Sequence, residues 1–269
     1  NKIDKWSDDH VATSFSNIIY NNEAYVIKNT LNKDHINNIL QKIEQVQIVK
    51  KFLHNNMGFT FPETIYMLDQ LQEYQLKDYH SEAENILKDC KNFLGINVQQ
   101  ITDMLKYLLR CNTLSFPQTA DNKYFTPFSV RYLSPGYGEM SFHCEKDLQK
   151  FSRYFYQSAS HQIDKNNIIS YFILLNKPNK GGKFAVYDIR NNDIKEKFSN
   201  TEFKLSNNKK INVEKDLNYI NIDLEEGDMF VFNGGDIWHR AEIVEGNEPR
   251  ITLGGFIAKG FNNEFYTWS

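Results

Sequence analysis

Residues 168–188 read IISYFILLNKPNKGGKFAVYD, and this stretch decides the fold class. Two apolar runs, residues 168–175 and 184–188, flank a turn-forming segment from Pro178 to Gly182. Short apolar runs bounded by Gly, Pro and Asn are typical of β-strands that reverse direction at the turn. We therefore expect two strands with a turn between them.

The same pattern recurs from about Phe125 onward. Further strand-like runs occupy residues 128–133, 140–144, 203–205, 219–222, 229–233, 239–244 and 250–257. Only residues 147–158 could form a helix between them, so the pattern indicates an antiparallel sandwich or barrel. The polar stretch 191–216 has few core-forming residues, and we expect it to be an inserted excursion.

The first part of the chain has a different periodicity. Between about residues 30 and 110, apolar residues recur three and four positions apart, which predicts helices at residues 31–48, 62–76, 81–93 and 98–109. Ser81 followed by Glu84 resembles a capping box. We expect one domain over residues 1–269, with a mainly helical part, 1–124, packed against a β core, 125–269.

Composition excludes several classes of function. The chain has 31 Lys and Arg against 34 Asp and Glu, and this near-neutral balance argues against a general nucleic-acid binder. No apolar stretch approaches the roughly 18 residues of a membrane span, so we expect no membrane partner. Three cysteines without a CxxC pair favour a reducing, cytoplasmic location. The sequence begins at Asn1 without a methionine, and we expect it to be trimmed there.

Two of the seven histidines, His143 and His239, lie in strand-like segments. In MSFHCE, residues 140–145, a strand would place His143 and Glu145 on one face, because alternate residues of a strand share a face. An imidazole and a carboxylate at this spacing could share one cation, with His239 as the natural third ligand. Such a set leaves three positions open on an octahedral metal, which suits non-haem Fe(II). The His-x-Glu pair alone is a weak signal, because a surface strand with a polar outer face gives the same pattern.

Arg250 and Thr252 supply a second signal. Both are expected on one face of the strand after His239, so a guanidinium and a hydroxyl would enter the cavity of the metal ligands. A buried arginine is costly unless it meets an anion, and its planar fork matches a carboxylate. We expect His239 and Arg250 to lie at the far ends of one antiparallel hairpin that turns at residues 245–249. A dicarboxylate that chelates iron at one end and binds Arg250 at the other would span the gap.

In order and spacing, these motifs resemble the Fe(II)- and 2-oxoglutarate-dependent dioxygenases. The matching segments are YLSPGYG (132–138), HCE (143–145), YFILLN (171–176), GGKF (181–184), GDMFVF (227–232), WHR (238–240) and RITL (250–253). The resemblance covers about residues 130–257 and implies a double-stranded β-helix, of jelly-roll or cupin-like type, in a mainly β chain with packed N-terminal helices. It further implies Fe(II) on His143, Glu145 and His239.

The resemblance also implies the cosubstrate and the reaction. Arg250, Thr252 and Tyr132 would bind 2-oxoglutarate, which is converted with dioxygen to succinate and carbon dioxide while an unactivated C–H bond is hydroxylated. Related halogenases carry a small residue in place of the carboxylate ligand so that halide can bind iron. Glu145 therefore favours hydroxylation over halogenation.

The substrate is expected to be small and amino-acid-like. The segments GGDIWHR (234–240) and RITLGGF (250–256) look like the subgroup that acts on free amino acids or small peptidic metabolites. Trp238, Tyr137 and Asp188 could line a substrate pocket. Their alternative roles are barrel packing for Trp238, a loop anchor for Tyr137 and an exposed strand end for Asp188.

Two other functions stay open, and a third is disfavoured. A protein or peptide hydroxylase of the same superfamily is compatible with the motifs. A cupin-like metal enzyme that does not use 2-oxoglutarate is a second possibility, and Arg250→Ala would discriminate it by leaving metal affinity nearly intact and removing 2-oxoglutarate binding only in an oxygenase. A non-catalytic binding module is disfavoured, because buried charges cost several kcal/mol when unpaired.

Overall fold

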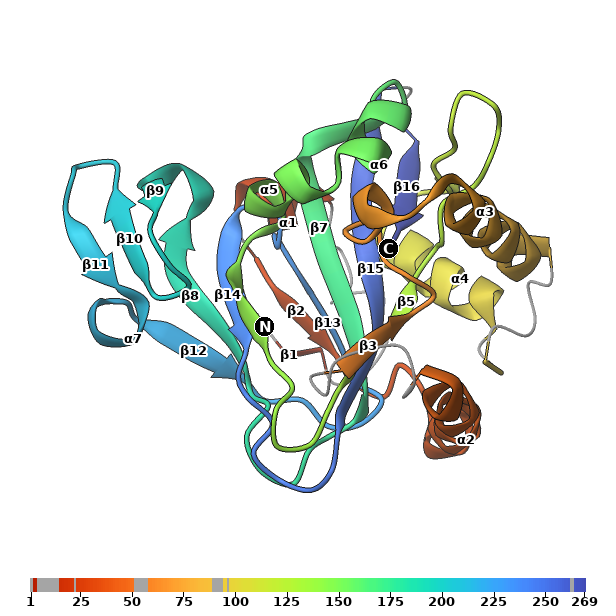
Figure 1. Ribbon diagram of the computed structural model, residues 1–269, viewed down its shortest axis with the longest axis horizontal. Coiled ribbons are helices and arrows are strands. Elements are labelled where there is room, and N and C mark those ends of the chain that lie inside the picture. The colour runs from red at the N-terminus through yellow and green to blue at the C-terminus, as the bar shows by residue number, and fades with distance from the viewer. Residues whose placement is uncertain are drawn as a thin grey trace.

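Two facing β-sheets form the centre of the molecule, and helices cover the outer side of the larger one (Figure 1). The computed structural model describes residues 2–3, 15–21, 23–50, 58–88, 94–95, 97–261 and 264–269. The larger sheet has the order β1-β2-β13-β7-β15-β16-β4, with β5 beside β15 and β3 beside β5. Its strands are β1 (Lys2–Ile3), β2 (Tyr25–Ile27), β3 (Gly58–Phe61), β4 (Leu114–Ser115), β5 (Ser129–Leu133), β7 (Ile163–Asn176), β13 (Met229–Phe232), β15 (Arg250–Gly260) and β16 (Phe265–Trp268).

The smaller sheet completes a jelly roll. It has the order β12-β8-β14-β6, and its strands are β6 (Met140–His143), β8 (Phe184–Arg190), β12 (Tyr219–Ile222) and β14 (Ile237–Ala241). The pairs β13·β7, β7·β15 and β15·β5 of the larger sheet and all pairs of the smaller sheet are antiparallel. The expected double-stranded β-helix is confirmed, although in the described part of the chain the two sheets stay separate and do not close into a hydrogen-bonded barrel.

The expected hairpin between His239 and Arg250 is wrong. Strand β14 pairs with β6 and β8, whereas β15 pairs with β5, β7 and β16. The connecting segment crosses from one sheet to the other, and it is held there by the N–H of Glu242 on the carbonyl of Lys183 (2.8 Å) and by the N–H of Val244 on the carbonyl of Gly138 (2.8 Å). His239 and Arg250 therefore reach the interior from opposite sheets.

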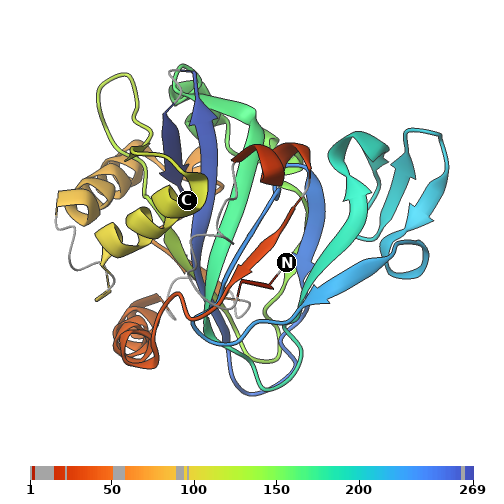
Figure 2. The same ribbon diagram turned by 180° about the vertical axis from the view of Figure 1, so that it is seen from behind.

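The register of β15 separates a polar inner face from an apolar outer face. Arg250 and Thr252 point into the space between the sheets, whereas Ile251 and Leu253 belong to the core on the outer side. That outer core includes Ile18 and other buried residues of the N-terminal helices. The helices are α1 (Phe15–Tyr20), α2 (Lys33–Lys50), α3 (Glu73–Lys88) and α4 (Val98–Leu109). Figure 2 shows α1 lying across the larger sheet, seen from behind.

The helix prediction was accurate for α4, where the apolar pattern is uninterrupted and a capping residue precedes the helix. Helix α4 has the predicted bounds, and the side chain of Asn97 accepts the N–H of Gln100 at 3.3 Å. The predicted capping box at Ser81 is wrong, because α3 begins at Glu73 and Ser81 is an exposed residue in its middle. The predicted stretch 62–76 contains a 3-10 turn, η1 (Leu68–Gln70), before α3, and residues 89–93 lie outside the described residues. Residues 147–158 fall within α5 (Glu145–Leu148), η2 (Gln149–Phe151) and α6 (Arg153–Ser158).

The excursion at 191–216 forms a small three-stranded sheet that covers the outer face of the smaller main sheet (Figure 1). Its elements are η3 (Asn191–Asp193), β9 (Ile194–Lys197), β10 (Glu202–Leu205), β11 (Lys210–Asn212) and α7 (Val213–Asp216). Phe203 and Val213 are fully buried there against Phe142 and Trp238. The excursion thus supplies the apolar cover that the smaller sheet needs.

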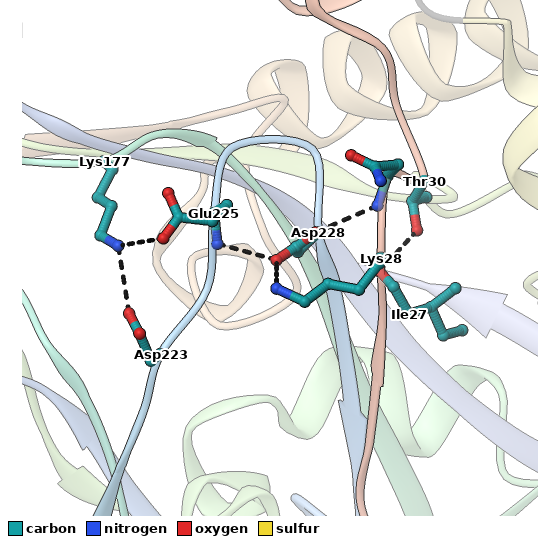
Figure 3. A network of polar contacts seen from close by, with 8 residues as sticks. Ile27, Lys28, Thr30, Lys177, Asp223, Glu225 and Asp228 are labelled. Carbon is teal, nitrogen blue, oxygen red and sulfur yellow. Dashed lines mark hydrogen bonds and ion pairs between the residues drawn. The ribbon is translucent and has the colours of Figure 1, made fainter. Parts of the chain in front are cut away.

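A buried carboxylate, Asp228, joins the segment after β2 to the turn before β13 (Figure 3). Asp228 is 1% exposed, and it accepts hydrogen bonds from Lys28 Nζ at 2.5 Å and from the backbone N–H groups of Asn29 (3.1 Å) and Glu225 (2.9 Å). A buried carboxylate is stabilised when a cation and backbone donors satisfy its oxygens. This network fixes β2 against the jelly roll. Among the helices that the structure describes, none combines the length and apolar character of a membrane span.

Candidate active site

The two strand histidines lie opposite each other in the smaller sheet. His143 ends β6, His239 lies in the middle of β14, and the two residues are cross-strand partners. Their ring centroids are 4.4 Å apart, and both side chains are buried. The sheet register alone therefore brings together two imidazoles that are 96 positions apart in the sequence.

Glu145 joins the histidines from the start of a helix, not from a strand. Strand β6 ends at His143, Cys144 is extended, and Glu145 is the first residue of α5. Its backbone N–H donates to the carbonyl of Gly234 at 3.0 Å, which fixes this turn beside the β13–β14 connection. One donor atom from each of His143, Glu145 and His239 lies within 4.8 Å of the others. Glu145 therefore lies near the two histidines as expected, but the argument from one shared strand face is wrong, because the strand ends at His143.

Both imidazoles are held in the tautomer that a metal ligand needs. His143 Nδ1 lies 2.5 Å from the carbonyl oxygen of Ser141, and His239 Nδ1 lies 2.9 Å from that of Ile237. A carbonyl can only accept, so each Nδ1 carries the hydrogen and each Nε2 keeps its lone pair. Burial lowers the pKa of His143 to about 4 and also lowers the pKa of His239. Both rings are therefore neutral at neutral pH.

The carboxylate of Glu145 is oriented by two hydroxyl groups. Tyr66 donates its phenolic hydrogen to Oε2, and Ser170 donates to Oε1 at 3.1 Å. Oε1 also lies 3.7 Å from Nε2 of His239. Burial raises the pKa of Glu145 to about 7, although the hydrogen bond from Tyr66 and the nearby charge of Arg131 act to lower it. Gly234 makes room for this arrangement, since a Cβ there would lie 2.0 Å from Ser170 Oγ.

This donor set fits a non-haem iron ion. Two neutral imidazole nitrogens and one carboxylate oxygen converge from three segments, and all three side chains are at most 5% exposed. Such a facial set leaves open positions for other ligands, and its chemistry is that of Fe(II) oxygenases. The hydrogen bonds from Tyr66 and Ser170 are of the kind that orient metal ligands.

Arg250 lies in the same cavity as Glu145 and His239. The cavity between the two sheets has a volume of about 60 Å³, and Thr252 also lines it. The guanidinium of Arg250 lies 5.1 Å from the ring centroid of Phe172 and 5.8 Å from that of Phe184. Within the residues that the structure describes, no carboxylate lies within ion-pair distance of Arg250, and burial lowers its pKa to about 9. This charge calls for an anionic ligand, and a dicarboxylate cosubstrate supplies one.

Four predicted site residues lie away from the cavity. Tyr132 points to the outer core and stacks on Phe59 at 4.9 Å between ring centroids. Trp238 is buried on the outer face of the smaller sheet, where it stacks on Phe142. Tyr137 is 64% exposed on its turn, and Asp188 is exposed on β8. None of these four residues lines the cavity around Glu145 and Arg250.

The sequence interpretation missed Arg131, Tyr66 and Ser170. Arg131 is the cross-strand partner of Thr252, whereas Tyr132 is the partner of Ile251. Since directly paired residues share a face, Arg131 lines the cavity and Tyr132 does not. Strand alternation could have revealed Arg131 had the pairing been known. Tyr66 lies 79 positions from Glu145 in an irregular segment, and no local pattern marks it.

Comparisons with known proteins agree with this site. The family model described as carrier-protein-independent halogenase WelO5 matches residues 9–269. No curated protein matches the chain.

Solved structures share the fold. An N-substituted L-amino acid dioxygenase from Burkholderia ambifaria AMMD has a TM-score of 0.54 at 12% identity, covering 91% of this chain and 86% of that one. The same dioxygenase in complex with alpha-KG has a TM-score of 0.53 at 11% identity, covering 92% and 86%. The non-heme alpha ketoglutarate dependent carbocyclase SnoK from nogalamycin biosynthesis has a TM-score of 0.50 at 10% identity, covering 94% and 87%.

The family match spans nearly the whole chain and includes all the residues that converge on the cavity. The chain belongs to the family of the carrier-protein-independent halogenase WelO5, and it is a non-haem iron, 2-oxoglutarate-dependent oxygenase.

Proposed function

We propose that this oxygenase is a hydroxylase of a small amino-acid-like substrate, with iron held by His143, Glu145 and His239. One observation carries the proposal, namely the buried carboxylate of Glu145 beside the two imidazoles. In related halogenases a small residue stands at this position and leaves a place for halide. Here the carboxylate fills that place, so hydroxylation is favoured although the family model is named for a halogenase.

The chain's own residues prepare the metal site. The backbone carbonyls of Ser141 and Ile237 fix the two imidazole rings, so both Nε2 lone pairs are directed without further rearrangement. Tyr66 and Ser170 orient the carboxylate of Glu145. Preorganised ligands spare the reorganisation that metal binding would otherwise require.

Arg250 and Thr252 would hold the cosubstrate. The guanidinium would bind the carboxylate of 2-oxoglutarate that is remote from the metal, and Thr252 would donate a hydrogen bond to it. When bound, iron and 2-oxoglutarate supply with dioxygen the oxidising power of the reaction. In the overall balance, substrate, 2-oxoglutarate and dioxygen give hydroxylated substrate, succinate and carbon dioxide.

Aromatic side chains would keep water out of the site. Phe172, Phe184, Phe232 and Phe256 line the cavity together with the polar residues. An apolar wall strengthens the electrostatic contacts inside and prevents side reactions of reactive species with solvent.

The nature of a structural neighbour supports a small substrate. One neighbour of the same fold is described as acting on N-substituted L-amino acids.

The test is product analysis with isotopically labelled dioxygen. Fe(II)-loaded enzyme would be incubated with 2-oxoglutarate, chloride, bromide and a panel of free amino acids, and products would be identified by mass spectrometry. We expect succinate and a product that gains one labelled oxygen atom and no halogen. Glu145→Gly should lose this hydroxylation.

Two results would contradict the proposal. A chlorinated or brominated product from the unaltered enzyme would show that Glu145 does not exclude halide. Turnover with peptides or proteins but with no free amino acid would favour the alternative of a protein or peptide hydroxylase.

A further inference from the structure

A second arginine lies at the boundary between the catalytic cavity and an outer hollow. Arg131 of β5 lines the cavity that contains Glu145, His239 and Arg250. It also lines a more open hollow of about 360 Å³ outside that cavity, formed largely by β3, β5 and the start of β6. Met140 is the other residue common to the two spaces. Arg131 and Met140 therefore form the boundary that the two spaces share.

The guanidinium of Arg131 makes no direct ion pair with a carboxylate in the described part of the chain, although the charge of Glu145 lies near it. Its one contact with a side-chain acceptor joins Nη1 to the sulfur of Met140 at 2.8 Å. A thioether is a weak acceptor, and a guanidinium offers five donors. Burial lowers the pKa of Arg131, although Glu145 and Tyr66 are near enough to raise it. A partly buried guanidinium without a direct ion pair is stabilised when an anion binds to it.

The cosubstrate does not need this second arginine. Arg250 already provides a guanidinium for the remote carboxylate, and the other end of 2-oxoglutarate belongs at the metal. Arg131 instead contacts Met140 and lines both spaces, and it lies two residues along the paired strand from the partner of Arg250. The carboxylate of Glu145 is engaged by Tyr66 and Ser170, which leaves Arg131 free for an incoming group.

The outer hollow has the opposite charge on its exposed side. Glu63 and Glu139 line it together with the apolar side chains of Phe59 and Met67. Glu139 is exposed and Glu63 is half-buried. A ligand in this space would meet a cation at the inner end and carboxylates farther out, which is the charge complement of a zwitterion.

We propose that Arg131 binds the carboxylate of an amino acid substrate, whose ammonium group faces Glu63 and Glu139. This inference rests on the proposed hydroxylase function and names the group by which that site recognises its substrate. A planar guanidinium and a carboxylate form two parallel hydrogen bonds, which fix orientation as well as position. Arg131 is thus a specificity-determining residue, distinct in role from Arg250.

The test separates substrate binding from cosubstrate binding. The twenty standard L-amino acids would be screened for stimulation of succinate formation, and each active one would be compared with its carboxamide. For Arg131→Met, we expect KM for the amino acid to rise by about 30-fold, as the loss of a charged hydrogen-bonding partner implies. The Kd of 2-oxoglutarate, measured anaerobically on the Fe(II)-loaded enzyme by its charge-transfer absorbance, should change by less than about threefold.

Matched variants make the result specific. Arg131→Lys should recover part of the affinity, because a cation without the planar fork remains. Arg250→Met should show the reverse pattern, with weak 2-oxoglutarate binding. The carboxamides tested on the unaltered enzyme should be as poor as the amino acid is with Arg131→Met, which keeps the inference testable if that variant does not fold.

Distinct failures overturn distinct claims. If 2-oxoglutarate binds but no amino acid stimulates its turnover, the proposed hydroxylase function fails and the inference about Arg131 fails with it. If amino acids react and their carboxamides react equally well, the inference about Arg131 is wrong and the hydroxylase function stands. If Arg131→Met loses 2-oxoglutarate binding, Arg131 belongs to the cosubstrate site. If an amino acid is halogenated, the proposed hydroxylase function fails instead.

Discussion

The two arginines of the cavity, Arg250 and Arg131, lie in contrasting surroundings. Arg250 is 4% exposed and lies between the rings of Phe172 and Phe184. Arg131 is only partly buried, contacts the sulfur of Met140, and also faces an open hollow with acidic residues. The guanidinium of Arg250 is thus packed against two rings, and the residue also lines a second pocket beside Pro178 and Gly182. The guanidinium of Arg131 instead contacts a flexible thioether and lines a hollow with acidic residues.

This difference indicates how one cavity can serve two anions. A site packed against aromatic rings suits a ligand of constant size, such as a cosubstrate. An open site beside a flexible methionine suits a ligand that enters and leaves with each turnover, and methionine accommodates varied shapes. The metal ligands lie in the same cavity, so both anions would approach the iron.

The largest effect is expected from removing a metal ligand, because both arginines line the cavity of the metal site. His239→Ala should lower Mn(II) affinity by about 100-fold or more, because loss of a ligand exceeds the roughly 10- to 100-fold cost of losing its outer partner. Turnover of 2-oxoglutarate should vanish with it. The matched control is His161→Ala, which changes an exposed histidine. Calorimetric titration with Mn(II) measures the difference, and equal affinities of the two variants would contradict the assignment.

Removal of the Arg250 guanidinium should separate the two anion sites. Arg250→Met should weaken 2-oxoglutarate binding by about 30-fold, as expected for losing charged hydrogen bonds. Mn(II) affinity should be unchanged, since Arg250 does not contact the three metal ligands. Parallel titrations of Arg250→Met and Arg131→Met with 2-oxoglutarate make the comparison, and identical losses would erase the proposed distinction.

Removing the Tyr66 hydroxyl, which donates to Glu145, tests whether metal binding depends on the N-terminal part of the chain. Tyr66→Phe should lower Mn(II) affinity by about 10-fold, because the carboxylate loses an orienting donor. Tyr156→Phe is the control, since Tyr156 is buried near Glu145 without a hydrogen bond to it in the described structure. Binding that is weakened equally in both variants would indicate a general packing defect.

The smallest effect is expected for Thr252. Thr252→Val keeps the shape of the side chain but removes one neutral hydrogen-bond donor, so the Kd of 2-oxoglutarate should rise about fivefold. KM for the amino acid should change little. A loss as large as that of Arg250→Met, measured by the same titration, would mean that the hydroxyl has a more central role.

The strands could be predicted because short apolar runs mark them in the sequence. The three candidate metal ligands could be selected because His143, Glu145 and His239 lie in or beside such runs. The predicted run 219–222 has the same bounds as β12. His143 and Glu145 lie close together as expected, even though the strand ends between them. The pairing of strands could not be predicted in the same way. A turn signal at residues 245–249 does not say whether the chain returns to the same sheet or crosses to the other, so the His239–Arg250 hairpin was wrong.

Errors in the substrate and cosubstrate residues follow from that limit. Which of two neighbouring residues, Arg131 or Tyr132, faces the cavity depends on the partner strand. Trp238 faces outward because the excursion provides an apolar cover with Phe203, and nothing local to Trp238 indicates this. Tyr66 reaches Glu145 only through the packing of the N-terminal segment on the jelly roll. Such long-range contacts leave no periodic trace in the sequence.

A crystal structure of the enzyme with Mn(II) and 2-oxoglutarate, grown without oxygen, tests the central claim most directly. The account predicts metal bound by Nε2 of His143, Nε2 of His239 and the carboxylate of Glu145, with the remote carboxylate of 2-oxoglutarate on Arg250. Arg131 should remain free to bind another anion. Metal bound away from these three side chains, or the remote carboxylate of 2-oxoglutarate on Arg131, would contradict the account.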